Sequence, residues 1–93
     1  MNVVITGASN GIGYQTVLRF AKEQGVNILA ISRDEEKLRN LKAKAEEAGL
    51  GGAIHIYIYD IRENNAQELL DQCRAIGFDH VDILINNAGA LVN

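Results

Sequence analysis

The chain has 93 residues, a length that corresponds to one small domain or to part of a larger one. Its formal net charge is −3 and its nine Lys and Arg are dispersed, so it lacks the basic stripe with which proteins bind a nucleic-acid backbone. It has no apolar run long enough to cross a membrane, no signal-peptide pattern and a single cysteine, Cys73, which excludes an internal disulfide. These features favour a cytoplasmic protein that binds neither nucleic acid nor membranes.

The first half of the chain predicts two buried strands separated by a helix. Residues 3–5 form a short apolar run that ends at a Thr-Gly pair. Over residues 13–24 apolar side chains recur at helical spacing, and Gly25 then stops the helix. Residues 26–31 are again mainly apolar and predict the second strand.

The second half repeats this alternation. Acidic residues at 34–36 open a helix that Gly49 ends. Residues 54–59 alternate isoleucine with His or Tyr, which is typical of a strand with unequal faces. A third helix is predicted over 66–73 and a fourth strand over 81–85. Strands that alternate with helices predict an α/β fold with a parallel sheet and right-handed crossovers.

The strongest chemical signal is the run T-G-A-S-N-G-I-G between the first strand and the first helix. Gly7 permits the tight turn out of the strand, Gly11 lets a pyrophosphate approach the backbone, and Gly13 lets the helix pack closely on the sheet. The first helical amides, at Ile12 and Gly13, have unpaired N–H groups that can bind the anion. The spacing differs from the general fingerprint G-x-G-x-x-G and from a P-loop. A compact turn without a ligand is the alternative.

Three motifs together resemble those of the short-chain dehydrogenase/reductase family. The glycine run is similar to that family's T-G-x-x-x-G-x-G cofactor motif, Asp60-Ile61 to the pair that ends its third strand, and N-N-A-G at residues 86–89 to the motif that ends its fourth. Each motif lies at the carboxyl end of a strand, where open α/β sheets bind ligands. The resemblance covers essentially the whole chain. It implies a partial Rossmann fold, with strands in the order 3-2-1-4 and helices on both faces, in which residues 1–93 form the N-terminal dinucleotide-binding segment.

The resemblance also implies a cofactor site. The phosphates and the nearby ribose would be surrounded by Gly7, Ser9, Asn10, Gly11, Ile12 and Gly13. Asp60 would accept a hydrogen bond from the adenine amino group, and the Ile61 amide would meet the ring. The adenosine ribose and the path toward the nicotinamide would be lined by Asn87, Ala88 and Gly89, while Asn86 would brace the loop. The alternatives are a capping or turn role for Asp60 and a plain polar turn for the asparagines.

The end of the second strand indicates which cofactor binds. An NAD site usually has a carboxylate there for the ribose hydroxyls, but Ser32 and Arg33 occupy the place. Arg33 can hold a 2′-phosphate through a bidentate, charge-assisted contact, and Ser32 can add a hydroxyl. This favours NADP over NAD, although Asn10 stands where NADP-dependent family members often have a second basic residue. A surface ion pair of Arg33 with Asp34 or Glu36 is the alternative.

The sequence shows no catalytic or metal-binding set. The resemblance implies a Tyr-x-x-x-Lys pair and a serine downstream of N-N-A-G, and no such pair occurs in this sequence. His55 and His80 lack the partners of a metal site, and Cys73 lies on an apolar helix face that predicts a core position. We therefore expect a chain that stops short of the catalytic half and does not transfer hydride by itself. We also expect self-association through the open edge of the fourth strand.

The reaction that the resemblance implies for the intact enzyme is interconversion of an alcohol and a carbonyl with NADP(H). Two other functions fit the sequence. A stand-alone nucleotide-binding or regulatory module would bind the same cofactor without catalysis. A methyltransferase that uses S-adenosylmethionine also has a glycine loop, but it normally has an acidic residue where Ser32 and Arg33 stand.

Overall fold

The computed structural model describes residues 1–9, 11–60 and 66–87. Its elements are, in chain order, β1 (Asn2–Thr6), α1 (Gly11–Ala21), β2 (Asn27–Ser32), α2 (Glu35–Glu47), β3 (Ala53–Ile58), α3 (Ala66–Ala75) and β4 (Ile83–Asn86). Neighbouring strands are parallel, and the sheet order is β3-β2-β1-β4. The α/β class and the strand order predicted from the sequence are confirmed. None of the helices in the described part of the chain is long and apolar enough to span a membrane.

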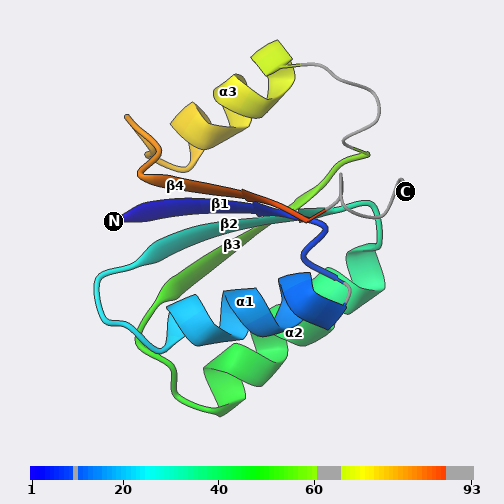
Figure 1. The fold of residues 1–93 in the computed structure, drawn as a ribbon, viewed down its shortest axis with the longest axis vertical. Helices are drawn as coiled ribbons and strands as arrows, with labels where there is room; N and C mark the ends of the chain where they lie inside the picture. Colours follow the sequence, from blue (N-terminus) through cyan, green and yellow to red (C-terminus); the bar gives the residue numbers. More distant parts are fainter. Residues whose placement is uncertain (10, 61–65, 88–93) are drawn as a thin grey trace.

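Helices cover both faces of the sheet (Figure 1). α1 and α2 lie on one face, over a core cluster that includes Val3, Ile5 and Leu38. α3 lies on the other face, over a smaller cluster that includes Val4 and Cys73. The three apolar residues of β1 are at most 2 % exposed, because alternate side chains of a central strand point to opposite faces and both faces are covered.

Helix α1 differs from the prediction at both ends. It begins at Gly11 rather than residue 13 and ends at Ala21 rather than residue 24. The next two amides donate to carbonyls three positions back, at 3.3 and 3.0 Å, so the chain leaves the helix through a tighter turn. Gly25, with φ 79°, lies in the turn before β2. Apolar spacing marks the buried face of a helix and not its last hydrogen bond, which explains the difference.

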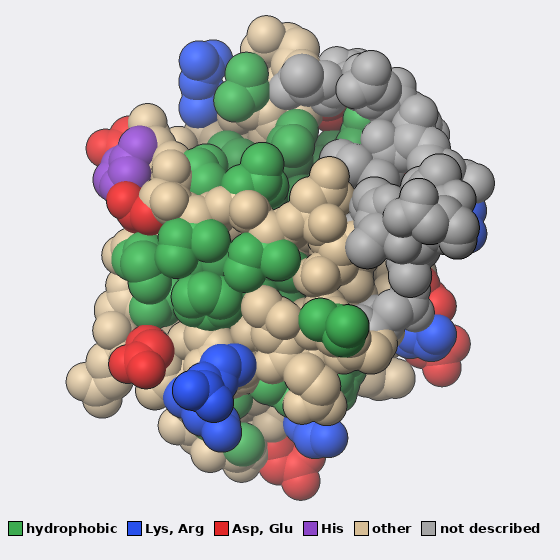
Figure 2. All heavy atoms as spheres, viewed as in Figure 1, with side chains coloured by type: hydrophobic (Ala, Val, Ile, Leu, Met, Phe, Trp, Pro, Cys, Tyr) green, Lys and Arg blue, Asp and Glu red, His purple; other side chains and the backbone are tan. Residues whose placement is uncertain are grey.

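Strand β4 is the outer strand of the sheet that the described residues form, next to β1. Ile83 and Ile85 pack against the cluster under α1, whereas Leu84 is 63 % exposed. Figure 2 shows hydrophobic side chains gathered on the face of the molecule along which this strand runs. Of these three consecutive side chains, the middle one is therefore mostly exposed.

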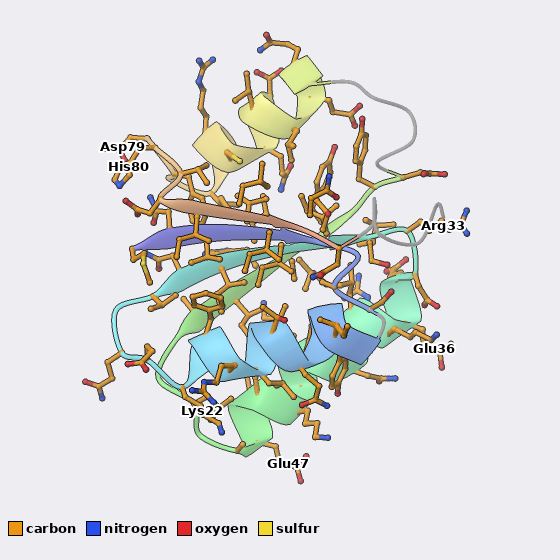
Figure 3. The ribbon with its side chains drawn as sticks, viewed as in Figure 1. Lys22, Arg33, Glu36, Glu47, Asp79 and His80 are labelled. Carbon is orange, nitrogen blue, oxygen red and sulfur yellow. The ribbon has the colours of Figure 1, made fainter. Side chains whose placement is uncertain are left out.

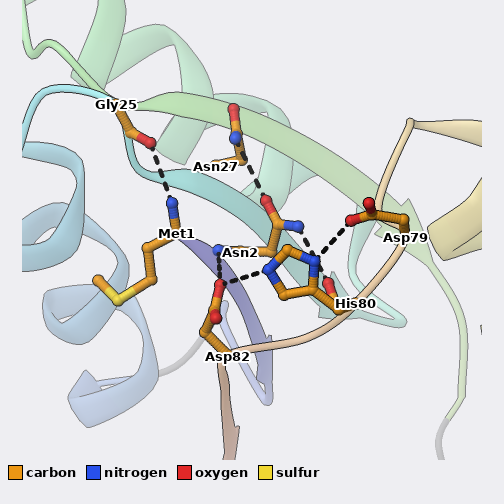
Figure 4. Close-up of polar contacts among 7 residues, drawn as sticks. All are labelled: Met1, Asn2, Gly25, Asn27, Asp79, His80 and Asp82. Atoms are coloured by element: carbon orange, nitrogen blue, oxygen red, sulfur yellow. Dashed lines mark hydrogen bonds and ion pairs between the residues drawn. The ribbon is translucent and has the colours of Figure 1, made fainter.

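Polar contacts join the start of β1 to the loop before β4, at the edge of the sheet opposite Arg33 (Figure 3). The Asn2 N–H donates to Asp82 Oδ2 at 2.7 Å, and Asn2 Nδ2 donates to the His80 carbonyl at 3.0 Å (Figure 4). His80 lies between two carboxylates, with Nδ1 2.6 Å from Asp79 Oδ1 and Nε2 3.2 Å from Asp82 Oδ2. The Asp82 side chain accepts from an amide that a strand carbonyl would otherwise bind, so β4 begins two residues later than predicted.

Two tyrosines and a cysteine connect β3 with α3. Tyr57 and Tyr59 stack with their ring centroids 5.3 Å apart, and the Tyr57 hydroxyl donates to Glu68 of α3 at 2.7 Å. Cys73 is 5 % exposed, and burial raises the pKa of its thiol. The core position of Cys73, predicted from the sequence, is confirmed.

Candidate functional site

The carboxyl ends of the strands lie at one edge of the sheet, on the right in Figure 1. Thr6 at the end of β1 pairs with Ile31 of β2 and with Asn86 of β4, and Ser32 at the end of β2 pairs with Ile58 of β3. From β1 the chain crosses to β2 on one side and later returns to β4 on the other. In an open parallel sheet, this reversal of strand order opens a crevice between the loops where ligands bind.

The turn between β1 and α1 is compact because two glycines meet there. Gly7 has φ 64°, a left-handed conformation that glycine adopts without strain. The Ala8 N–H donates to the Ile31 carbonyl at 3.1 Å, which holds the turn against β2. A Cβ on Gly13 would lie 2.1 Å from the Gly7 carbonyl oxygen, so any larger residue would push the helix from the strand. The close packing expected of Gly13 is confirmed.

The first turn of α1 has no acidic residue and an exposed surface. A Cβ on Gly11 would meet nothing within 4 Å, and Ile12 is 78 % exposed. Helix α2 differs, because Asp34 caps it by accepting from the Lys37 N–H at 3.1 Å and two glutamates follow. Both helix ends have unpaired N–H groups and a positive dipole end. α2 supplies its own carboxylates there, whereas the first turn of α1 contains none.

Two buried serines join the glycine loop to the end of β2. Ser9 Oγ and Ser32 Oγ are 2.6 Å apart, and the residues are 8 % and 9 % exposed. Ser32 Oγ also accepts from the Asp34 N–H at 3.1 Å. The bond between the hydroxyls uses one of their two protons, so the pair keeps one O–H donor for a further acceptor.

Arg33 extends outward from the turn after β2 (Figure 3). Its Nη1 lies 3.8 Å from Asp60 Oδ2, and the two side chains are 67 % and 25 % exposed. Within the described residues its ion pair is therefore with Asp60, and not with Asp34 or Glu36. The partner follows the end of β3, so the pair joins the ends of two neighbouring strands.

The end of β4 is bonded to the end of β1. Thr6 Oγ1 donates to Asn86 Oδ1 at 2.7 Å, and the Asn87 N–H donates to the Thr6 carbonyl at 3.3 Å. Asn86 thus braces the loop, as predicted, through a threonine that sequence reasoning did not single out. Asn87 Nδ2 is buried and has no hydrogen-bond partner among the described residues. A buried donor of this kind is costly unless a ligand or a solvent molecule accepts from it.

Comparison with known proteins identifies the family. The family model described as short chain dehydrogenase matches residues 1–93. The chain belongs to the short chain dehydrogenase family. This membership excludes the methyltransferase alternative.

Several short chain dehydrogenase relatives are similar over nearly the whole chain. The fatty acyl-CoA reductase of Acinetobacter baylyi is 42 % identical over 86 residues, which are 92 % of this chain and 28 % of that protein. The serine 3-dehydrogenase of Agrobacterium fabrum is 39 % identical over 94 % of this chain and 32 % of that protein. The L-sorbose reductase of Gluconobacter frateurii, solved with NADPH and L-sorbose, matches with a TM-score of 0.80 at 31 % identity, over 95 % of this chain and 33 % of that one. The chain thus spans about a third or less of the length of these relatives.

The residues expected from the sequence to bind the cofactor fall into two groups. Those that the structure describes lie at the carboxyl edge of the sheet, at a strand end, in the turns that follow the strands or in the first turn of α1: Gly7, Ser9, Gly11, Ile12, Gly13, Ser32, Arg33, Asp60 and Asn87. Asn10, Ile61, Ala88 and Gly89 lie outside the described residues. Sequence reasoning missed the Ser9–Ser32 bond and the Arg33–Asp60 pair. The predicted strand order was the available signal, since it places the ends of strands two and three side by side.

The two histidines and the cysteine lie away from this edge. No group of three or more His, Cys, Asp or Glu within residues 1–9, 11–60 and 66–87 could hold a metal ion. His55 meets the Phe78 ring edge-on at 6.2 Å, and burial, aided by the charge of Lys42, lowers the pKa of its imidazole. His80 belongs to the polar contacts at the amino ends of the strands.

Proposed function

We propose that this chain binds a nicotinamide dinucleotide across the carboxyl edge of its sheet, with the pyrophosphate at the amino end of α1. The observation that carries the proposal is this helix end, which has open space beside Gly11 and no acidic residue in its first turn. Free N–H groups and the helix dipole favour an anion at such a place. The orphaned Asn87 Nδ2 donor and the spare proton of the Ser9–Ser32 pair suit a ligand rich in hydroxyl and phosphate oxygens.

Within this site the residues bind and orient the cofactor. The exposed Ile12 side chain offers apolar surface for the dinucleotide to cover. As the family resemblance implies, Asp60 would accept a hydrogen bond from the adenine amino group, and Asn87 would line the adenosine ribose. The dinucleotide, when bound, supplies the hydride-transfer chemistry.

NADP is the cofactor that we propose for this site, in preference to NAD. Arg33 stands at the end of β2 with a guanidinium that is exposed enough to meet a 2′-phosphate, and the Ser32 hydroxyl is one residue away. The similarity to the L-sorbose reductase, which was solved with NADPH, supports this preference.

For the whole protein we propose interconversion of an alcohol and a carbonyl by hydride transfer. Dehydrogenase and reductase names among the relatives support this reaction class. The 93 residues contain no Tyr-x-x-x-Lys pair, so we assign them cofactor binding and no acid–base step. A polypeptide of these residues alone should then transfer no hydride at an enzymatic rate.

Fluorescence titration with NADPH and NADH tests the proposed site. We expect NADPH to bind more tightly, and Arg33→Ala to weaken NADPH binding about tenfold or more with little effect on NADH. The reason is that a hydrogen bond to a charged group contributes about 1.5–3 kcal/mol. Arg39→Ala is the matched control, because Arg39 pairs with Glu35 on the surface of α2 and its loss removes the same charge elsewhere. A chain that binds neither dinucleotide would refute the proposal.

A further inference from the structure

Arg33, the cation proposed to hold the 2′-phosphate, already has an anionic neighbour. Asp60 Oδ2 lies 3.8 Å from Arg33 Nη1. The sheet sets this juxtaposition, since Ser32 pairs in register with Ile58 and the Tyr59 N–H donates to the Ser32 carbonyl at 2.9 Å. That hydrogen bond joins the residue before Asp60 to the residue before Arg33, which keeps the two charged side chains next to each other.

We propose that Asp60 is a specificity-determining residue that lowers the preference of this site for a 2′-phosphorylated dinucleotide by opposing the charge of Arg33. The inference rests on the proposed function and deepens it. This role of Asp60 differs from its expected contact with adenine. The adenine ring is common to NADPH and NADH, whereas only NADPH has the 2′-phosphate.

The distance between Arg33 and Asp60 indicates whether Asp60 raises or lowers the preference for a 2′-phosphorylated dinucleotide. A hydrogen-bonded guanidinium–carboxylate pair has an N–O distance of about 2.7–2.9 Å, so a separation of 3.8 Å is a contact between charges without a hydrogen bond. Such a loose contact does little to orient Arg33, whose side chain is 67 % exposed. Its main effect is electrostatic. The carboxylate offsets part of the guanidinium charge and so weakens the attraction of Arg33 for a phosphate.

Asp60 is the more buried member of the Arg33–Asp60 pair. The Asp60 side chain is 25 % exposed, so it has less freedom to turn into solvent than the side chain it faces. Asp34, the acidic residue next to Arg33 in the sequence, is occupied instead at the start of α2, where it accepts from the Lys37 N–H and lies 4.0 Å from Lys37 Nζ. A 2′-phosphate therefore competes for Arg33 with Asp60.

The test compares NADPH and NADH binding to the unmodified chain and to Asp60→Asn. The ratio of the two affinities is the measured quantity, because a change in the shared adenine contact alters both affinities alike and cancels. We expect the substitution to raise the preference for NADPH about two- to fivefold, which is the range that exposed ion pairs reach. Glu36→Gln removes the same charge from the first turn of α2 and should leave the ratio nearly unchanged.

A double-variant cycle establishes whether the effect acts through Arg33. In an Arg33→Ala background we expect Asp60→Asn to change the ratio much less, because no guanidinium charge remains to be opposed. An equal gain in both backgrounds would indicate direct repulsion of the phosphate and would overturn the inference. So would an unchanged or lower ratio for Asp60→Asn alone, although the proposed function would stand. Absence of binding of both dinucleotides to the unmodified chain would refute the proposed function, and the inference with it.

Discussion

At the scale of single residues, the candidate site depends on the absence of a side chain at Gly13 and on the hydroxyls of Ser9 and Ser32. The Gly13 backbone lies against the carbonyl of Gly7, which sets how closely α1 approaches β1. The serine hydroxyls join the loop before α1 to the end of β2 and keep one proton for a ligand. The loop is thus positioned by contacts of the fold before any cofactor binds.

We predict that Gly13→Ala destabilises the fold and abolishes cofactor binding. The added Cβ would lie 2.1 Å from the oxygen and 2.9 Å from the carbon of the Gly7 carbonyl, and these are backbone atoms that a rotamer change cannot move. Overpacking of this kind costs about 1–3 kcal/mol. Urea unfolding measures the change in the free energy of unfolding, and a dinucleotide titration measures binding.

Gly49→Ala is the matched control for this substitution. Gly49 has φ 68° and an added Cβ there would meet nothing within 4 Å, so its cost of about 1–2 kcal/mol comes from the backbone conformation alone. Because Gly49 follows the end of α2, away from the site, cofactor binding should persist in this variant. If Gly13→Ala were as stable as the unmodified chain and bound cofactor normally, the packing explanation would be wrong.

At the scale of elements, the two edges of the sheet have different polar chemistry. At the carboxyl edge, the first turn of α1 has no acidic residue, whereas α2 is capped by Asp34 and has two glutamates in its first turn. At the amino edge, His80 and its neighbours join the loop before β4 to the start of β1. The second set contacts no residue assigned to the cofactor, so we interpret it as structural.

We predict that His80 stabilises the chain more at about pH 6 than at about pH 8. The hydrogen bond to Asp79, followed by the charges of Asp82 and Asp79, raises the pKa of His80 above its usual value of about 6.5. A pKa raised by folding gives a contribution that is complete below the unfolded-state pKa and is lost as the pH rises through the folded-state pKa. The measurement is the difference in melting temperature between the unmodified chain and His80→Gln at the two pH values.

The charge of Asp82 helps to raise the pKa of His80, but the titration of the Asp82 carboxyl itself does not add to this pH dependence. The Asn2 N–H is the main cause that lowers the pKa of its carboxyl, so its contribution is present above the unfolded-state pKa and is lost only as the pH falls through the lowered folded-state value. Asp79→Asn removes the strongest partner of His80 and should flatten the pH dependence. If the stabilisation by His80 grew as the pH rose, the explanation from its raised pKa would be wrong.

At the scale of the whole molecule, the outer strand β4 and the residues just before it expose large apolar side chains. Leu84 is 63 % exposed and Val81, just before the strand, is 43 % exposed. Both lie along an edge that pairs with no further strand of the described residues. Strand edges with exposed apolar side chains pair readily with other chains.

We predict that a polypeptide of these 93 residues self-associates through β4 and that Leu84→Lys weakens the association. A lysine on an edge strand opposes pairing because its charge must stay hydrated. Sedimentation velocity over a range of concentrations is the measurement. Leu70→Lys places the same charge on α3, where the leucine is 49 % exposed, and should leave the association intact. A monomeric unmodified chain at all concentrations would contradict the prediction.

The sequence by itself determined the fold class and the edge at which the candidate site lies, whereas the strand order was implied by the resemblance of its motifs to the short-chain dehydrogenase/reductase family. The buried runs at residues 3–5 and 26–31, separated by one helix, require parallel strands whose carboxyl ends share an edge. The role of Gly13 in close packing also follows from its place in the motif. These features could be predicted because hydrophobic periodicity and turn chemistry act over a few residues.

Only the tertiary structure decided which side chains meet at that edge. Arg33 pairs with Asp60 of the next strand end and not with its sequence neighbours, and Ser9 bonds to Ser32. The start of β4 likewise depends on a side-chain contact with β1 at the far edge of the sheet. Such contacts depend on the register and spacing of neighbouring strands, which are set by packing over the whole sheet and have no local pattern in the sequence.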